Sequence, residues 1–388
     1  MNFGIVCEFN PFHNGHAYLL EAARSIGAEN IVCAMSGNAV QRGELAVADK
    51  YLRAEAALRC GADLVLEIPF PWSAASAEFF ALAGIRILRR YCDLVIFGSE
   101  CGDIKLLETA ANLSLDKEFI DRFESRKKSG EGAASAYFSL LSERVGIELS
   151  SNDILGVEYI KAAKKLGAEL DFYTVARKGS AYRESSLEPM KNPSATALRN
   201  EWRSGRVSLE EYMPSQAIEA YERAFDNGEI TDNSLLERAY LMFFRLSRSE
   251  DLSGIAEAEG GIADRLCLLA RESKDFESFW AALRTKRYTD AKLRRAMLFC
   301  LTSVSTELLH TAPEYTYLLA ANDKGRAILS SARKSAKAED VKLITKPADT
   351  LKQSAQFAAE DRLNALFALA RENAPSLCDV YRKNAFIM

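Results

Sequence analysis

Histidine and closely spaced cysteine are what this sequence has least of. Only three of the 388 residues are histidine, and none of the eight cysteines forms a Cys-x-x-Cys pair. A structural zinc site takes four such ligands at short spacings, so the sequence offers no zinc motif. Several cysteines lie inside apolar runs, such as Cys33 in NIVCAM and Cys300 in FCLTSV. This usage is typical of buried, reduced thiols and predicts a cytoplasmic protein.

Long apolar runs and an excess of positive charge are also missing. No apolar stretch reaches the roughly 18 residues of a membrane helix, so we expect no membrane partner. The first residues, MNFGIVCEFN, lack the basic and apolar segments of a signal peptide. The formal net charge is −4 and the pI is about 5.7. A nucleic-acid site therefore has to be a local basic segment and not the whole surface.

The first hundred residues alternate between apolar runs of strand length and helix-like segments. The runs are short and rich in β-branched residues, as strands buried on both faces of a parallel sheet are. This alternation predicts an α/β fold with a Rossmann-like, doubly wound parallel sheet and right-handed crossovers. The predicted strands are residues 3–7, 30–35, 63–68, 93–98 and 170–179, and the clearest predicted helices are 16–27, 47–61, 76–91 and 154–167.

Beyond residue 206 the pattern changes to helical spacing throughout. We find no strand alternation there, in segments such as ADRLCLLARES and LRRAMLFCLTSVSTELLH. A chain of this length is also too long for one ordinary core. We therefore expect a Rossmann-like domain over residues 1–205, followed by an all-helical domain over residues 206–388.

The turn FNPFHNGH, residues 9–16, holds two of the three histidines. It follows the first predicted strand and precedes the first helix. The carboxyl end of such a strand is where ligands bind, and a helix N-terminus suits phosphate. Gly15 permits close backbone approach. The familiar phosphate loops GxGxxG and GxxxxGK[ST] are absent here. The turn therefore predicts a triphosphate site in which His13 and His16 stabilise charge as the α-phosphate is attacked and pyrophosphate leaves.

Two other interpretations of this turn remain open. In the first, the turn is structural, with one histidine capping the helix and the other merely exposed. In the second, His13 and His16 begin a zinc site, although no third ligand lies nearby and His310 is far away in sequence. The only metal we expect is Mg²⁺ carried by the nucleotide.

Several blocks of the chain resemble one family. The His-x-Gly-His turn after a first strand is similar to that of the HUP-type, Rossmann-like nucleotidyltransferases. The longer blocks resemble the bacterial tRNA(Met) cytidine acetate ligases over nearly the whole chain. These blocks are GIVCEFNPFHNGH, MSGNAVQRGELAVADKYLRAEAAL, GADLVLEIPFPWSAASAEFF, FGSECGD, SNDILGVEYIKA and, in the C-terminal half, TKRYTDAKLRRAMLFCLTSV.

The resemblance implies a ligase that forms a carbon–nitrogen bond and converts ATP to AMP and pyrophosphate. Such an enzyme activates acetate as an acetyl-adenylate, without acetyl-CoA, and acetylates the amine of the wobble cytidine of elongator tRNA(Met). That amine is a poor nucleophile and acetate is a poor acyl donor. The acetyl-adenylate, a mixed anhydride, is a far better acyl donor and so makes the transfer possible. His13 and His16 would act in the first step.

The resemblance also implies which residues contact ATP. Without it, Gly102 is a turn glycine, Asn152 a helix cap and Arg177 a surface cation. The expected ATP-binding residues are Cys7, Glu8, Phe9, Asn10, Pro11, Phe12, His13, Asn14, Gly15, His16, Ala17, Tyr18, Leu19, Leu20, Gly102, Asn152 and Arg177.

A second phosphate motif is suggested by NPSATALR, residues 192–199. Ser194, Thr196 and Arg199 would contact phosphate from another helix N-terminus. The relatives usually have two adjacent hydroxyl residues here, whereas Ala195 separates them in this chain. A plain capping role for these hydroxyls is the alternative.

Three cations after the second predicted strand are also candidates. Arg42, Lys50 and Arg53 would face acetate, phosphate or tRNA. The alternative is that Arg53, with Glu55, belongs to a solvated helix face.

A basic span between residues 284 and 346 is the predicted tRNA surface. It holds 13 basic and six acidic residues, a net charge of +7 in a chain whose remainder carries −11. Such segregation is typical of a surface that binds a nucleic-acid backbone. Tyr288, Tyr315 and Tyr317 would offer rings for an unstacked base. The alternative is a solvated helical face with core tyrosines. The residues expected to contact tRNA are Arg284, Lys286, Arg287, Arg294 and Arg295.

Two other functions fit part of this pattern. A small-molecule nucleotidyltransferase would use the same first step, but it would not need the large helical half with its basic span. A non-catalytic RNA-binding module would not need the intact histidine turn.

Overall fold

The predicted parallel strands form the centre of one mixed sheet. The computed structural model describes residues 1–128, 132–176, 209–334, 341–350 and 352–388. The sheet has the strand order β10-β8-β5-β2-β1-β6-β7, with β9 beside β8. Its parallel part consists of β1 (Asn2–Cys7), β2 (Asn30–Ser36), β5 (Leu64–Ile68), β6 (Leu94–Ser99) and β7 (Asp171–Ala176). All five predicted strands are confirmed, as is the Rossmann-like α/β class.

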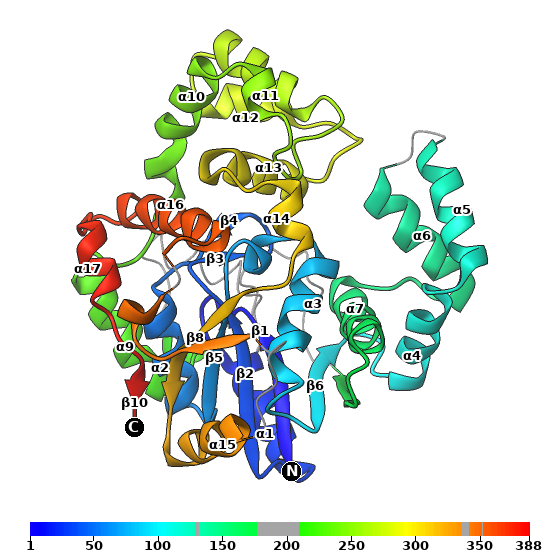
Figure 1. The fold of residues 1–388 in the computed structure, drawn as a ribbon, viewed down its shortest axis with the longest axis vertical. Coiled ribbons are helices and arrows are strands. Elements are labelled where there is room, and N and C mark those ends of the chain that lie inside the picture. Colours follow the sequence, from blue (N-terminus) through cyan, green and yellow to red (C-terminus); the bar gives the residue numbers. More distant parts are fainter. Residues whose placement is uncertain (129–131, 177–208, 335–340, 351) are drawn as a thin grey trace.

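Helices cover both faces of this sheet because its strands are apolar on both sides (Figure 1). Alternate residues of β1 enter two separate cores: Val6 packs in one, and Ile5 in the other. The Val6 core contains residues of α3 (Ala77–Leu88) and α7 (Ser151–Leu166), and the Ile5 core contains residues of α1 (Asn14–Ser25), α2 (Lys50–Arg59) and α9 (Ser215–Asp226). The four helices predicted in the first half of the chain are therefore all present.

The prediction of no strand beyond residue 206 is wrong. β8 (Tyr315–Ala321) pairs antiparallel with β5, and β9 (Lys342–Ile344) and β10 (Phe386–Ile387) both pair with β8. All seven residues of β8, YTYLLAA, are buried. A run buried on both faces shows no alternation, and periodicity alone does not separate it from a buried helix. The C-terminal half therefore supplies one edge of the central sheet.

The remaining helices form an arm at the side of the sheet and a group above its carboxyl ends (Figure 1). The arm consists of α4 (Ile104–Leu113), α5 (Lys117–Lys128) and α6 (Ala133–Val145). The upper group consists of α10 (Glu237–Leu246), α11 (Ile262–Glu272), α12 (Phe276–Leu283) and α13 (Asp290–Thr302). The others are α14 (Thr306–His310), α15 (Asp323–Lys334), α16 (Ala355–Leu369) and α17 (Leu377–Tyr381).

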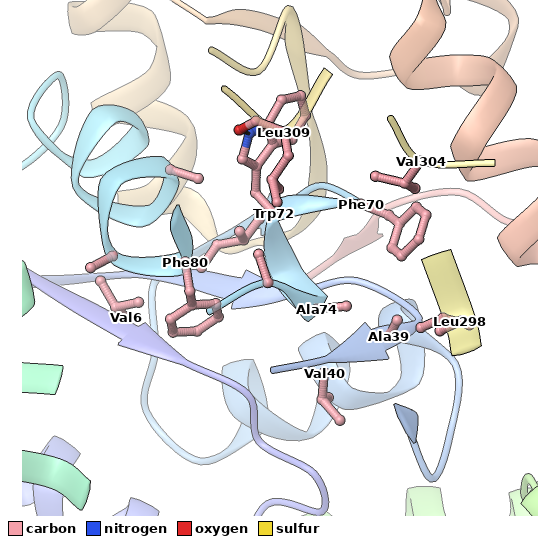
Figure 2. Packing of buried hydrophobic residues seen from close by; sticks show 14 of the residues in the cluster. Val6, Ala39, Val40, Phe70, Trp72, Ala74, Phe80, Leu298, Val304 and Leu309 are labelled. Carbon is pink, nitrogen blue, oxygen red and sulfur yellow. Dashed lines mark hydrogen bonds between the residues drawn. The ribbon is translucent and has the colours of Figure 1, made fainter. Parts of the chain in front are cut away.

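A buried cluster joins the sheet to the upper helices. Phe70, after β5, lies edge-on to Phe299 of α13, with ring centroids 5.9 Å apart. The Trp72 indole donates hydrogen bonds to the carbonyls of Leu309 and Thr311, at 3.2 and 3.1 Å. Figure 2 shows this packing, from Val6 in the sheet to Leu298 and Val304. The upper helices thus share a core with the central sheet. Among the described residues, no helix is long and apolar enough to cross a membrane.

Candidate nucleotide site

The strand order reverses between β1 and β6, whose carboxyl ends lie side by side. From β1 the chain proceeds outward through β2 and β5, and then returns to β6 on the other side of β1. In doubly wound sheets the ligand binds where the strand order reverses in this way. The segments that leave this point are residues 8–13, after β1, and residues 100–103, after β6. They carry the histidine turn and the Gly102 turn, so the structure brings these two predicted parts together.

His13 and His16 both cap the N-terminus of α1 through their Nδ1 atoms. His13 Nδ1 accepts a hydrogen bond from the Gly15 N–H at 3.0 Å, and His16 Nδ1 accepts one from the His13 N–H at 3.2 Å. An accepting Nδ1 carries no proton, so in each neutral ring the proton lies on Nε2. The rings stack with centroids 3.8 Å apart. The predicted cap is real, and it leaves each imidazole in the tautomer that presents an N–H donor at Nε2.

Arg53 of α2 holds the beginning of the turn. Its side chain is fully buried, and its guanidinium donates to the carbonyls of Glu8 (2.6 Å), Ala48 (3.0 Å) and Ser36 (3.0 Å), and also to that of Gly37. Burial lowers the pKa of Arg53 from its ordinary value. The interpretation of Arg53 as part of a solvated helix face is therefore wrong. The residues next to Arg53 in sequence do not predict its burial, because all but one of its carbonyl partners come from other elements.

Further contacts fix the rest of the turn. The Phe9 side chain is buried, and its backbone lies in the left-handed region with φ +44°. This conformation costs about 1–3 kcal/mol and persists only where the surrounding structure holds it. Asn10 Oδ1 accepts a hydrogen bond from the Val47 N–H at 2.7 Å. The Phe12 N–H donates to the Tyr221 hydroxyl at 3.1 Å. The support from Tyr221 comes from α9, in the C-terminal half, which sequence reasoning did not connect to this turn.

The Gly102 turn follows β6, the strand next to β1. Gly102 has φ +63°, and an added Cβ would lie 2.9 Å from the Cβ of Ala176, at the end of β7. Its N–H donates to the buried Ser99 hydroxyl at 3.0 Å. The position thus requires glycine for its backbone and for the close approach of β7. Gly102 and the histidine turn leave neighbouring strands at the same edge of the sheet.

Asn152, in the first turn of α7, contacts the segment that contains Gly102. Its Nδ2 donates to Glu100 Oε1 at 2.7 Å, and Ser150 donates to the other carboxylate oxygen of Glu100. Burial raises the pKa of Asp153, but hydrogen bonds from Ser150 and from the Cys101 N–H outweigh it and hold this pKa below its ordinary value. Asn152 therefore lies beside the Gly102 turn, and its contact with ATP stays a prediction. Glu100, which the sequence analysis did not single out, orients it.

Four of the predicted residues lie outside the described residues. These are Arg177, Ser194, Thr196 and Arg199. Their proposed contacts with ATP and phosphate stay predictions.

Lys50 is buried between two carboxylates and does not face an open site. Its Nζ lies 2.7 Å from Glu67 Oε2 and 3.2 Å from Glu360 Oε1, and the Tyr317 ring centroid is 4.4 Å away. Burial raises the pKa of Glu67 to about 7, against the opposing effect of Lys50. The ammonium group is thus neutralised within the protein, which argues against its prediction as a phosphate ligand. Arg42 lies half-buried at the tip of the hairpin that follows β2.

The predicted basic span does not form one surface. Arg284, Lys286 and Arg287 are exposed before α13, above the carboxyl ends of the sheet. Lys324 instead lies on α15, where its Nζ donates to the Glu29 carbonyl beside the amino end of β2. Lys334 and Lys337 have no described side chain. The charge at residues 284–287 is therefore the part of the span that lies on the ligand side.

Arg294 and Arg295 of α13 are engaged within the protein. Arg294 Nη1 lies 3.2 Å from Glu44 Oε1, and Arg295 Nε lies 2.8 Å from Glu257 Oε1. Tyr315 and Tyr317 are buried strand residues of β8, so their prediction as stacking platforms is wrong. Tyr288 is half-buried, and its hydroxyl donates to the Gly260 carbonyl.

The described residues contain no group of three or more His, Cys, Asp or Glu side chains that could hold a metal ion. The zinc alternative for the histidine turn therefore finds no support among them. The site instead offers two imidazoles with N–H groups at Nε2, placed at the positive end of a helix dipole, and this arrangement suits anionic oxygen.

Comparison with known proteins gives this site a family. Residues 1–378 match the model of the HIGH nucleotidyl transferases. A tRNA(Met) cytidine acetate ligase of Syntrophotalea carbinolica is 33% identical over 94% of this chain and 90% of its own length. One of Thermotoga petrophila is 35% identical over 85% of this chain and 84% of its own.

Solved structures agree with the sequence comparison. The crystal structure of apo Thermotoga maritima TmcAL has a TM-score of 0.89 and 30% identity, covering 100% of this chain and 99% of that one. A crystal structure of the same protein bound with alpha-thio ATP has a TM-score of 0.87, with the same identity and coverage. This chain therefore belongs to the HIGH nucleotidyl transferases and, among them, to the tRNA(Met) cytidine acetate ligases.

Proposed function

We propose that this protein is an ATP-dependent ligase that acetylates the wobble cytidine of elongator tRNA(Met). Its relatives are named for this substrate, and a similar structure carries an ATP analogue. The observation that carries the proposal is the pair His13 and His16, stacked at the N-terminus of α1 where the strand order of the sheet reverses. A helix N-terminus with imidazole N–H donors suits a triphosphate whose α-phosphate is attacked.

The reaction has two steps. An acetate oxygen attacks the α-phosphorus of ATP, and pyrophosphate leaves with the electron pair of the broken P–O bond. The N4 amine of cytidine then attacks the acetyl carbonyl, AMP leaves, and the nitrogen gives up a proton. His13 and His16 stabilise the charge of the first step, so the protein's role is mainly positioning and electrostatic. Mg²⁺ would accompany the triphosphate, and acetyl-CoA would not be needed.

Gly102, Asn152 and Arg177 complete the ATP site in this proposal. Gly102 follows β6, the strand next to β1, and Asn152 donates to Glu100 just before it. Arg177 follows β7, whose last residue, Ala176, lies close to Gly102. The exposed cations Arg284, Lys286 and Arg287 belong to the tRNA surface. We further propose a cytoplasmic enzyme, which its eight free cysteines support.

Nucleoside mass spectrometry of tRNA tests the function directly. Purified protein is incubated with tRNA, ATP and acetate, and in a parallel reaction with acetyl-CoA in place of both. N4-acetylcytidine should form only with ATP and acetate, at one position of elongator tRNA(Met). Acetylation from acetyl-CoA alone would contradict the proposal. Transfer of a nucleotide to a small molecule, without modified tRNA, would favour a small-molecule nucleotidyltransferase.

A further inference from the structure

The β3–β4 hairpin lies between the nucleotide turn and the upper helices. Its strands, β3 (Ala39–Val40) and β4 (Glu44–Leu45), follow the carboxyl end of β2 and form a separate two-stranded sheet. On one side the Gln41 N–H donates to Glu8 Oε1 at 2.8 Å. Glu8 is the first residue after β1 and leads directly into the histidine turn. One end of the hairpin is therefore tied to the nucleotide site.

The other side of the hairpin rests on the backbone of α13. Gly43 has φ +72°, and an added Cβ would collide with the backbone nitrogen of Arg295 and lie 2.8 Å from the carbonyl carbon of Arg294. Only glycine permits this approach, for conformational and for steric reasons. The tip of the hairpin thus packs directly against one turn of α13.

An ion pair fixes the same contact. Arg294 Nη1 lies 3.2 Å from Glu44 Oε1, and the guanidinium stacks 5.1 Å from the centroid of the Trp280 ring, in α12. Both side chains of the pair are more than half buried, at 33% and 25% exposed. Arg294 therefore connects the hairpin to α12 and α13 together.

The segment that α13 orients is the one with exposed cations. Residues 284–287 run from the end of α12 to the Thr289 cap of α13. Deeper in the contact, Ala39 and Val40 of the hairpin share a buried cluster with Leu298 of α13 (Figure 2). A shift of α13 against the hairpin would therefore move the cationic segment relative to the nucleotide turn, which the hairpin contacts on its other side.

We infer that the β3–β4 hairpin is a positioning element that sets the distance between the acyl-adenylate and the bound tRNA. Gly43 and the Glu44–Arg294 pair carry this role, which rests on the proposed function. Arg294 then acts through Glu44 and not through a phosphate of the RNA. Adenylate formation needs only the ATP site, whereas acetyl transfer needs the ATP site and the cationic segment in register. The contact should therefore matter for the second step and little for the first.

Charge reversal separates this role from direct RNA contact. Glu44→Arg adds positive charge next to the tRNA surface, so direct electrostatic binding predicts equal or faster transfer. Positioning predicts the opposite, because the introduced guanidinium would repel Arg294 and displace α13. Acetate-dependent exchange of pyrophosphate into ATP measures the first step, and kcat/KM for tRNA measures transfer. We expect Glu44→Arg to keep exchange within about twofold and to lose transfer about tenfold or more.

The double exchange Glu44→Arg with Arg294→Glu is the decisive variant, because it restores the pair with its signs reversed. We expect it to recover most of the lost transfer, as coupled residues do in a double-mutant cycle. The matched control is the exposed pair Arg248 and Asp251, 3.1 Å apart on the surface, whose Arg248→Glu change should leave both steps unaltered. Gly43→Ala should also lose transfer, but it lowers the melting temperature as well, so the charge exchange carries the test.

The outcomes distinguish this inference from the function on which it rests. Unimpaired transfer by Glu44→Arg, or a double variant no better than Arg294→Glu alone, would overturn the positioning role while wild-type activity stands. Wild-type protein that neither exchanges pyrophosphate nor acetylates tRNA would overturn the proposed function and this inference with it.

Discussion

The imidazole rings of His13 and His16 lie face to face, with centroids 3.8 Å apart and planes 30° apart. Each ring uses Nδ1 to accept a backbone N–H of the same turn. This geometry fixes the tautomer of both rings and leaves their donors on Nε2. The hydrogen bonds that cap the helix therefore also prepare the rings to bind anionic oxygen, so the structural and the catalytic interpretations of the turn are compatible.

His16→Ala should abolish acetylation and leave tRNA affinity near normal. Loss of one well-placed donor to developing charge lowers kcat by about 10²–10³-fold. The measurement is acetylation rate, with tRNA binding followed separately. His310→Ala is the control, because His310 is exposed and packs on Phe79 with ring centroids 4.9 Å apart, away from the turn. A collapse of tRNA affinity in His16→Ala would instead make the turn structural or part of the RNA site.

Gly102→Ala should raise KM for ATP. The change strains a backbone at φ +63° and pushes a Cβ against Ala176, the last residue of β7. Gly167→Ala is a matched control, because Gly167 has φ +57° but no atom within 4 Å of the added Cβ. Both variants should lose about 1 kcal/mol of unfolding free energy from the left-handed backbone. Only Gly102→Ala should also weaken the binding of ATP. An equal effect of both variants on KM for ATP would mean that Gly102 is not part of the site.

How far the sequence predicts this molecule depends on how local each feature is. The histidine turn is a strand, a turn and a helix cap in consecutive residues, so its place at the sheet edge could be predicted. Gly102 and Asn152 were reached only through family resemblance, since their proximity depends on how β6 and α7 pack. The buried role of Arg53 could not be predicted at all, because its carbonyl partners at Glu8, Ser36 and Gly37 belong to other segments.

The errors have the same physical origin. β8 is buried on both faces, so it lacks the alternation by which a strand is recognised, and its tyrosines look like candidate stacking rings. The basic span was counted along the chain, whereas folding sends Lys324 to the amino end of the sheet and keeps residues 284–287 at the carboxyl end. Charge counted along a sequence predicts a surface only where the fold keeps the segment together.

The unfolding free energy of Glu67→Gln, relative to that of wild type, should increase as the pH rises from 5 to 8. Burial raises the pKa of Glu67 from 4.5 to about 7, so the folded state holds this proton more tightly than the unfolded state. The stability that this proton contributes is complete below pH 4.5 and is lost as the pH rises through 7. Glutamine cannot ionise, so the Glu67→Gln variant avoids this loss of stability.

Thermal unfolding at several pH values measures this difference. Glu222→Gln, on the exposed side of α9, should follow the wild-type pH profile and serves as the control. Parallel profiles for wild type and Glu67→Gln would mean that Lys50 keeps Glu67 ionised throughout this range.

Lys286→Glu combined with Arg287→Glu should weaken tRNA binding and flatten its salt dependence. Both side chains are exposed in the segment before α13, above the carboxyl ends of the sheet. Each phosphate contact that is lost reduces the slope of log K against log salt by about 0.7–0.9. Affinity measured between low and moderate salt gives this slope. The matched control is Lys324→Glu with Arg326→Glu, an equal charge change on exposed α15 residues at the amino end of the sheet. If the α15 pair changed the slope instead, tRNA would approach from the side opposite the nucleotide turn, and the proposed path of the wobble base to the acyl-adenylate would fail.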